Sequence, residues 1–156
     1  MSEQIQALEA NRFGIIASRF NGHIVEEMLQ GALEAFAAND VARDLIDVRH
    51  VPGAFELPVV AGAMAESGQY RAIIALGAVI RGDTAHFEYV SSACAHGLSQ
   101  VGVEYLLPVI FGVLTTDTVE QALERAERQQ GNKGFEMAMA ALETAQVIDE
   151  LAGTDS

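Results

Sequence analysis

Residues 77–90 read Gly-Ala-Val-Ile-Arg-Gly-Asp-Thr-Ala-His-Phe-Glu-Tyr-Val, and they continue an apolar run that begins at Ala72. A short, uncharged apolar run predicts a strand that is buried on both faces of a sheet. The run ends in a glycine turn at Gly82, and Asp83, Thr84 and His86 follow where a helix should begin. In an open α/β sheet, ligands bind outside the carboxyl ends of the strands, and the free N–H groups of a starting helix can hold an anion. The stretch therefore predicts a strand–turn–helix unit and the position of a ligand site.

Similar strand-like and helix-like segments alternate along the whole chain. Short apolar runs predict strands at residues 13–17, 46–51, 72–77 or a little beyond, and 109–114. Apolar residues at helical spacing predict helices over residues 24–36 and 57–64, and a third helix over residues 84–105. A capping box at residues 118–121 predicts a fourth helix that stops near Gly131, and a last helix should span residues 133–151.

This alternation predicts an α/β fold in which helices cover both faces of a four-stranded parallel sheet. With right-handed crossovers, the simplest winding is a three-layer αβα arrangement with the flavodoxin-like strand order 2-1-3-4. A length of 156 residues suits one domain over residues 1–156. We expect residues 1–11 and 152–156 to be flexible or to lie at subunit contacts.

Composition and charge exclude several classes of function. The net charge of −13 argues against nucleic-acid and anionic-membrane partners, because both require a basic face. No uncharged apolar run is long enough to span a membrane, and the first residues lack the features of a signal peptide, so a cytoplasmic protein is expected. The single cysteine, Cys94, permits no intrachain disulfide and agrees with a reducing compartment.

Two other loops that follow strands carry groups suited to a flat heterocyclic ligand. Phe20 precedes an Asn-Gly turn, where its ring either stacks on a ligand or covers the core as a hydrophobic plug. Ala54, Phe55 and Glu56 stand at a helix start after Pro52-Gly53. Their amides and the carboxylate match the donor and acceptor edges of a heterocycle, although Glu56 can also simply complement the helix dipole.

The third loop is suited to an anion and to proton transfer. Asp83 or Thr84 can cap the helix and leave neighbouring amides free for an oxyanion such as phosphate. His86 falls in the first helical turn, where the positive end of the helix favours a neutral imidazole that can accept a proton. A single histidine is more often structural, but the convergence of three loops favours a catalytic role here.

Three residues lie away from these loops. Phe111 falls inside the fourth strand and Arg125 about two turns into the fourth helix, so their positions do not place either on the crevice of its own chain. One interpretation is that both reach the crevice of a neighbouring chain. Core packing and a helix-surface pair are the alternative interpretations of these two residues. Lys133, the single lysine, opposes a helix dipole, so we expect an anionic group near it.

Taken in order, these segments resemble those of the lumazine synthases, which perform the penultimate step of riboflavin biosynthesis. The similarity extends from about Phe13 to Leu151 in the family's order and spacing. The matching segments are Ser-Arg-Phe-Asn at 18–21, Val-Pro-Gly-Ala-Phe-Glu-Leu-Pro at 51–58, the segment 77–90 quoted above, Pro-Val-Ile-Phe-Gly-Val-Leu-Thr-Thr at 108–116, Glu-Gln-Ala-Leu-Glu-Arg-Ala at 120–126 and Gly-Asn-Lys-Gly at 131–134.

The resemblance implies an activity and an assembly. The family joins 5-amino-6-(D-ribitylamino)uracil to 3,4-dihydroxy-2-butanone 4-phosphate, giving 6,7-dimethyl-8-ribityllumazine, phosphate and water without a cofactor. Its sites lie between adjacent subunits of a homopentamer, and a decamer or a sixty-subunit icosahedral shell is permitted. The roles implied are pyrimidine stacking for Phe20, contacts to the ring edges and ribityl chain for Ala54, Phe55, Glu56, Ala78, Val79 and Ile80, phosphate binding for Asp83, Thr84 and Arg125, proton transfer for His86, and the neighbour's wall of the pocket for Phe111.

One departure and two alternatives accompany this interpretation. Glu127 stands where the family usually has a small residue, which brings a carboxylate close to the phosphate-binding arginine. A non-catalytic flavin-binding or shell-forming protein on the same scaffold would not need His86. A flavodoxin-like electron carrier would need a hydroxyl-rich phosphate loop after the first strand, and Phe20-Asn21-Gly22 does not supply one. We expect no metal, because His86 has no second histidine or cysteine at ligand spacing.

Overall fold

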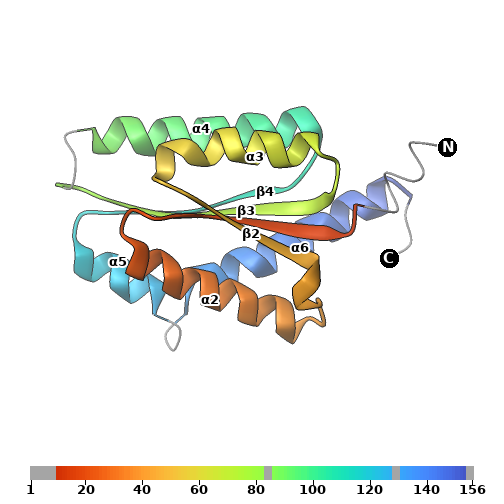
Figure 1. The fold of residues 1–156 in the computed structure, drawn as a ribbon, viewed down its shortest axis with the longest axis horizontal. Coiled ribbons are helices and arrows are strands. Elements are labelled where there is room, and N and C mark those ends of the chain that lie inside the picture. Colours follow the sequence, from red (N-terminus) through yellow and green to blue (C-terminus); the bar gives the residue numbers. More distant parts are fainter. Residues whose placement is uncertain (1–9, 83–85, 128–130, 154–156) are drawn as a thin grey trace.

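The computed structural model describes residues 10–82, 86–127 and 131–153 (Figure 1). Within these residues the strands are β1 (Arg12–Ser18), β2 (Ile46–Val51), β3 (Tyr70–Ile80) and β4 (Val109–Thr116). They form one sheet in the order β2-β1-β3-β4, and every neighbouring pair is parallel. The predicted four-stranded parallel sheet with order 2-1-3-4 is therefore confirmed.

Helices cover both faces of the sheet. In the described residues they are α2 (Gly22–Ala38), α3 (Leu57–Glu66), α4 (Phe87–Tyr105), α5 (Val119–Ala126) and α6 (Lys133–Leu151), with short 3-10 turns η1 (Arg43–Leu45) and η2 (Ala54–Glu56). Figure 1 shows α3 and α4 on one face, and α2, α5 and α6 on the other. The expected three-layer αβα arrangement is thus confirmed.

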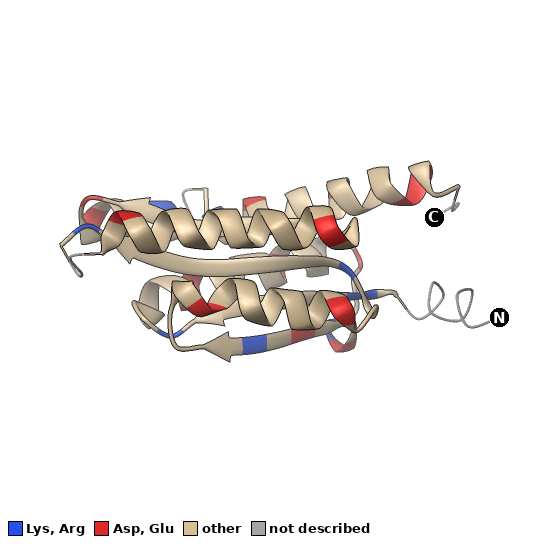
Figure 2. Ribbon diagram, turned by 90° about the horizontal axis from the view of Figure 1, so that it is seen from above, with Lys and Arg blue, Asp and Glu red and all other residues tan. Residues whose placement is uncertain are grey.

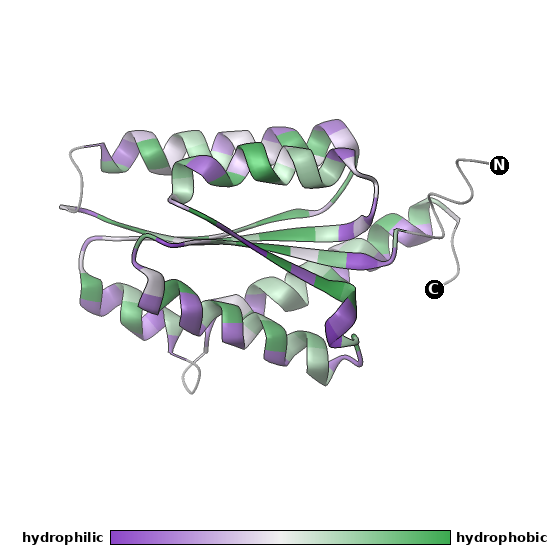
Figure 3. Cartoon of the chain, viewed as in Figure 1, coloured by the Kyte–Doolittle hydropathy of each residue, from purple (hydrophilic) through white to green (hydrophobic). Residues whose placement is uncertain are grey.

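The core has two halves, one on each side of the sheet. Strand β3 is the centre of both, because Ile74 and Leu76 pack with α2 and α6, while Ile73 and Ala75 pack with α3 and α4. Apolar colouring follows the strands in Figure 3, as expected for strands buried on both faces. Acidic residues recur along the outer surfaces of the helices, with few basic residues among them (Figure 2).

Two helix boundaries differ from the sequence prediction. Helix α4 begins at Phe87 and has His86 as its N-cap, and residues 84 and 85, where the helix was expected to start, lie outside the described residues. Helix α5 begins at the predicted capping box but ends at Ala126, not near Gly131. The backbone becomes extended at Glu127, and the carbonyl of Ala126 accepts a hydrogen bond from Asn132 Nδ2 at 2.7 Å, which satisfies this end of the helix.

No helix within residues 10–82, 86–127 and 131–153 is long and apolar enough to cross a membrane.

Candidate active site

A cavity of about 210 Å³ is bordered by the loops that follow β1 and β2 and by the carboxyl end of β3. This is the crevice in which open α/β sheets bind their ligands. Segments far apart in the sequence line it, and α4 contributes Val90. The lining residues are Phe20, Gly53, Ala54, Phe55, Glu56, Ala78, Val79, Ile80 and Val90.

Hydrogen bonds between backbones join the first two loops. The amide of Arg19 donates to the carbonyl of Val51 at 2.8 Å, and the amide of Phe20 donates to the carbonyl of Pro52 at 3.1 Å. These bonds extend the pairing of β1 with β2 beyond the strand ends, so the aromatic ring is carried on a fixed backbone. The side chain of Phe20 is 54% exposed, which leaves it available at the rim of the cavity.

Asn21 connects the first loop to the third strand. It adopts a left-handed conformation with φ 58° and ψ 42°, which asparagine tolerates better than most residues. Its Nδ2 donates to the carbonyl of Ala78 at 3.0 Å. Asn21 therefore fixes the Phe20 loop against Ala78, which lines the cavity. From the sequence, the Asn-Gly pair predicted only a turn.

The second loop forms the short helix η2, which leads directly into α3. Ala54 is buried, while Phe55 is exposed beside the cavity. The amide of Glu56 donates to the carbonyl of Gly53 at 3.2 Å, so this amide is used within the turn. The expectation that the amides of residues 54–56 are free for a ligand is therefore wrong for Glu56. Glu56 lines the cavity and also stands at the N-cap of α3, where a carboxylate complements the helix dipole.

The floor and roof of the cavity are apolar. Ala78, Val79 and Ile80 close β3 and are all buried. Val90, one turn into α4, completes the lining. The sequence pattern placed Val90 only on the core face of its helix, because apolar spacing does not distinguish a core contact from a cavity wall.

His86 stands at the start of the same helix. It is the N-cap of α4, is exposed, and its carbonyl accepts a hydrogen bond from the amide of Val90 at 2.9 Å. Its ring lies 6.3 Å from that of Tyr89, between centroids. His86 is one turn of helix from Val90 and does not itself line the cavity. Asp83 and Thr84, which were expected to form the anion-binding loop, lie outside the described residues.

Arg81, the residue after β3, contacts both the end of β4 and the start of α4. Its Nε lies 2.8 Å from Asp117 Oδ1, at the end of β4, and its guanidinium stands 4.9 Å from the ring centroid of Phe87. Its amide also donates to the carbonyl of Thr116 at 2.8 Å. Arg81 thus fixes the end of β3 against β4 and against the start of α4.

Phe111 and Arg125 do not reach the cavity of their own chain. Phe111, 39% exposed on β4, lines a groove of about 440 Å³ with residues of α4. Arg125 lines a separate hollow of about 340 Å³, together with Lys133 and Glu136. The structure therefore brings together the residues of the first three strand ends. It leaves Phe111 beside α4 and Arg125 on the opposite face of the sheet, beside α6.

The chain matches a known family over most of its length. The family described as 6,7-dimethyl-8-ribityllumazine synthase matches residues 10–149. The chain belongs to the 6,7-dimethyl-8-ribityllumazine synthase family. A 6,7-dimethyl-8-ribityllumazine synthase of Clostridium kluyveri is 52% identical over 143 residues, covering 92% of this chain and 93% of the relative. A protein of the same name from Desulfatibacillum aliphaticivorans is 48% identical over 150 residues, covering 96% of this chain and 97% of the relative.

The region matched by the lumazine synthase family contains every predicted site residue, including Phe111 and Arg125. In this region Lys133 has the anionic neighbour that its position predicted, because its Nζ lies 3.5 Å from Glu136 Oε2. Glu127, which was expected to bring a carboxylate close to Arg125, is exposed. The described residues that line the Arg125 hollow do not include Glu127.

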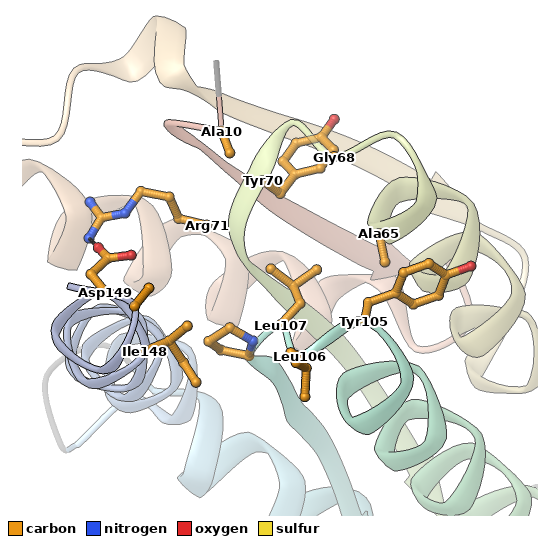
Figure 4. A pocket seen from close by; sticks show the side chains of 12 residues that line it. Ala10, Ala65, Gly68, Tyr70, Arg71, Tyr105, Leu106, Leu107, Ile148 and Asp149 are labelled. Carbon is orange, nitrogen blue, oxygen red and sulfur yellow. Dashed lines mark hydrogen bonds and ion pairs between the residues drawn. The ribbon is translucent and has the colours of Figure 1, made fainter. Parts of the chain in front are cut away.

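Another cavity, of about 300 Å³, lies near the opposite ends of the strands (Figure 4). Two of the charged or polar groups at this cavity already have partners: Arg71 forms an ion pair with Asp149, and the hydroxyl of Tyr70 donates to Asp47 Oδ2 at 2.8 Å. The hydrogen bonds from Arg12 are the main cause that lowers the pKa of Asp47 to about 2. Burial, followed by the bond to Asp47, raises the pKa of Tyr70 to about 12. This end of the sheet is held by paired charges and is not the candidate active site.

Cys94 is a buried free thiol, and burial raises its pKa to about 11. A thiol held protonated in this way is a poor nucleophile. Among the described residues, no group of three histidine, cysteine, aspartate or glutamate side chains could hold a metal ion.

Proposed function

We propose that this chain is a transferase that condenses 5-amino-6-(D-ribitylamino)uracil with 3,4-dihydroxy-2-butanone 4-phosphate. The products are 6,7-dimethyl-8-ribityllumazine, phosphate and water, at the penultimate step of riboflavin biosynthesis. An amine attacks the ketone, water leaves to give an imine, phosphate is eliminated, and the second amine closes the ring with loss of water. The reaction needs no cofactor.

The observation that carries the proposal is that two loops and the carboxyl end of β3 converge on one cavity in a chain of this family. An exposed aromatic ring, a carboxylate and an apolar floor surround about 210 Å³ at the carboxyl end of the sheet. A flat, polar heterocycle needs this combination, because its faces prefer an aromatic neighbour and its edges prefer hydrogen-bonding groups. Phe20 stacks on the pyrimidine, and Glu56 together with the backbone of residues 54–56 and 78–80 binds the ring edges and the ribityl chain.

The second substrate needs groups that the cavity of one chain lacks. We assign phosphate binding to Asp83, Thr84 and Arg125, and the wall beyond the pyrimidine to Phe111. Phe111 and Arg125 line hollows away from the cavity of their own chain. This arrangement supports a homopentamer in which one subunit completes the site of the next.

His86 moves protons between the amines, the carbinol oxygen and the leaving groups. Its place at the start of α4, one turn from the cavity wall, supports this role. Proton transfer of this kind contributes about 10²-fold. Alignment of the two substrates contributes several kcal/mol more, so positioning is the larger effect. A cytoplasmic location for this single-domain enzyme is supported by the free thiol of Cys94.

The decisive experiment mixes the purified full-length chain with both substrates and follows the absorbance of the lumazine product. Omission of either substrate gives the baseline. Phe20→Leu keeps an apolar side chain but removes the flat ring, whereas Phe20→Tyr keeps the ring. We expect the half-saturating concentration of the pyrimidine to rise in Phe20→Leu and to remain close to that of the unmodified chain in Phe20→Tyr.

Two results would refute the proposal. Folded protein that forms no product from the two substrates would leave the non-catalytic flavin-binding or shell-forming alternative, which riboflavin titration would then test. Equal pyrimidine affinity in Phe20→Leu and the unmodified chain would show that the cavity around Phe20 is not the pyrimidine site.

A further inference from the structure

Asn132 is a buried polar residue in the connection between α5 and α6. Only 3% of its surface is exposed, and its amide makes three hydrogen bonds. Nδ2 donates to the carbonyl of Ala126 at 2.7 Å and to the carbonyl of Glu27 at 2.9 Å, while Oδ1 accepts from the amide of Phe135 at 2.9 Å. Both amide protons and the carbonyl oxygen are therefore used within the fold.

These three bonds connect the end of α5, the start of α6 and the body of α2. Ala126 ends α5, Glu27 lies in α2, and Phe135 lies in the first turn of α6. The residue before Ala126 is Arg125, and the residue after Asn132 is Lys133. The bonded groups of Asn132 therefore adjoin both cations along the chain.

The cations share one hollow. Arg125 and Lys133 line the same space of about 340 Å³, beside the end of β4. Two cations on the ends of different helices keep a useful spacing only if the helix ends are fixed, because a displacement of about 1 Å can cost a factor of about 10² in a catalysed reaction.

Asn132 packs against Gly31 of helix α2. Gly31 faces the amide so closely that a Cβ at this position would lie 2.1 Å from Asn132 Oδ1. A side chain at residue 31 would therefore displace the asparagine. The glycine and the asparagine form one packing unit.

We propose that Asn132 is a positioning residue that holds Arg125 and Lys133 at the spacing required to bind the phosphate group of the four-carbon substrate. The inference rests on the proposed function, in which Arg125 binds this phosphate. Asn132 does not touch the substrate. It acts through the end of α5 and the start of α6.

Two substitutions separate this role from simple capping of α6. Aspartate and serine both accept a hydrogen bond at a helix N-terminus, so Asn132→Asp and Asn132→Ser keep the bond to the amide of Phe135. Neither can replace both donated bonds, to Ala126 and to Glu27. The serine variant also carries no charge, so it controls for the effect of a new carboxylate near the cations. Asn39→Ser is the matched control, because Asn39 Nδ2 donates to the carbonyl of Ala35 at 2.8 Å at the far end of α2.

The experiment measures steady-state kinetics on the full chain with each substrate varied separately, and it measures inorganic phosphate binding by calorimetry. In both Asn132 variants we expect the KM for the phosphorylated substrate and the Kd for inorganic phosphate to rise about tenfold or more, as when a charged contact is weakened. The KM for the pyrimidine should change less than about twofold. Neither constant depends on how much of the protein is folded, so a partial loss of folded protein does not obscure the result. Asn39→Ser should leave all three constants unchanged.

Parallel measurements on Arg125→Ala separate the possible failures. If Arg125→Ala leaves the KM for the phosphorylated substrate unchanged, the assignment of phosphate binding in the proposed function is wrong. If Arg125→Ala raises this KM while the Asn132 variants do not, the positioning role alone is wrong. In the Arg125→Ala background, Asn132→Ser should raise this KM by a smaller factor than it does alone, because one of the two groups that it positions is already absent.

Discussion

Gly134→Ala should destabilise the protein, although alanine is the better helix former. Gly134 lies in the first turn of α6, where this helix packs against α2. A Cβ at this position would lie 1.8 Å from the carbonyl oxygen of Met28 and 2.5 Å from its carbonyl carbon. Because these are backbone atoms, no rotation of a side chain can relieve the overlap. Along the line joining these atoms, the start of α6 must move away from α2 by roughly 1.7–2.2 Å to restore van der Waals contact at about 3.5–4.0 Å.

The free-energy change follows from two opposing effects. Overpacking of a well-packed interface costs about 1–3 kcal/mol. The gain in helix propensity from glycine to alanine is at most about 1 kcal/mol. Displacement of α6 also disturbs the neighbouring bonds of Asn132. We therefore expect a net loss of about 2 kcal/mol in the free energy of unfolding.

The assay is urea unfolding followed by circular dichroism, with all proteins at one concentration because assembly stabilises the folded state. Gly62→Ala is the control. It lies inside α3, and the nearest atom to its added Cβ would be Val101 Cγ2 at 3.8 Å, an ordinary contact. Gly62→Ala should therefore stabilise the protein by about 0.5–1 kcal/mol. A Gly134→Ala protein as stable as the unmodified chain, with Gly62→Ala behaving as expected, would refute the inferred approach of α2 and α6.

Four further predictions follow from the site and the fold. Arg125→Ala should raise the half-saturating concentration of the phosphorylated substrate and leave pyrimidine binding nearly intact, whereas His86→Ala should mainly lower turnover, by about 10²-fold. Both are measured by steady-state kinetics with each substrate varied separately. An unchanged affinity for the phosphorylated substrate in Arg125→Ala, or unchanged turnover in His86→Ala, would contradict these roles. The free energy of unfolding should decrease as the pH falls from about 4 to about 2. In this range the unfolded chain binds a proton at Asp47, whereas the folded state, in which the pKa of Asp47 is about 2, keeps it ionised. Equal free energies of unfolding at pH 4 and pH 2 would contradict this. Light scattering should give a pentamer or a multiple of it, and a stable, active monomer at micromolar concentration would be incompatible with the shared site. Activity should survive treatment with a chelator, and specific restoration by one divalent ion would show that a metal is required.

The sequence predicted the fold well because buried parallel strands have a simple pattern. Residues 13–17 and 46–51 lie in β1 and β2 almost as predicted, and the 2-1-3-4 order follows from right-handed crossovers. Strand β3 extends beyond its predicted core of 72–77, as the prediction allowed, because its apolar run continues to Ile80 and residues 77–80 stay paired with β4. The end of α5 could not be predicted, since it depends on the hydrogen bond to Ala126 from a residue of the next loop.

The candidate site was predicted in part. Two of the three loops named from the sequence meet at one cavity with the end of β3, because all parallel strands end at the same edge. Asp83 and Thr84 of the third loop lie outside the described residues, and His86 does not line the cavity. Val90 was missed as a lining residue, and the bond from Asn21 to Ala78 was missed because 57 residues separate the two in sequence. The network of Asp47 with Arg12 and Tyr70 was missed for the same reason.

The sequence by itself determined the local properties of this protein: which segments form strands and helices, where the turns fall, and which loops carry aromatic, acidic and cationic groups. Periodicity and capping act over a few residues, so they can be read along the chain. Only the tertiary structure decided which groups share a space. It joined Phe20, Glu56 and Val90 around one cavity, and it placed Arg125 with Lys133 in another hollow. These neighbours are set by the packing of whole helices on a sheet, and contacts such as that between Gly134 and Met28 have no signature in either segment alone.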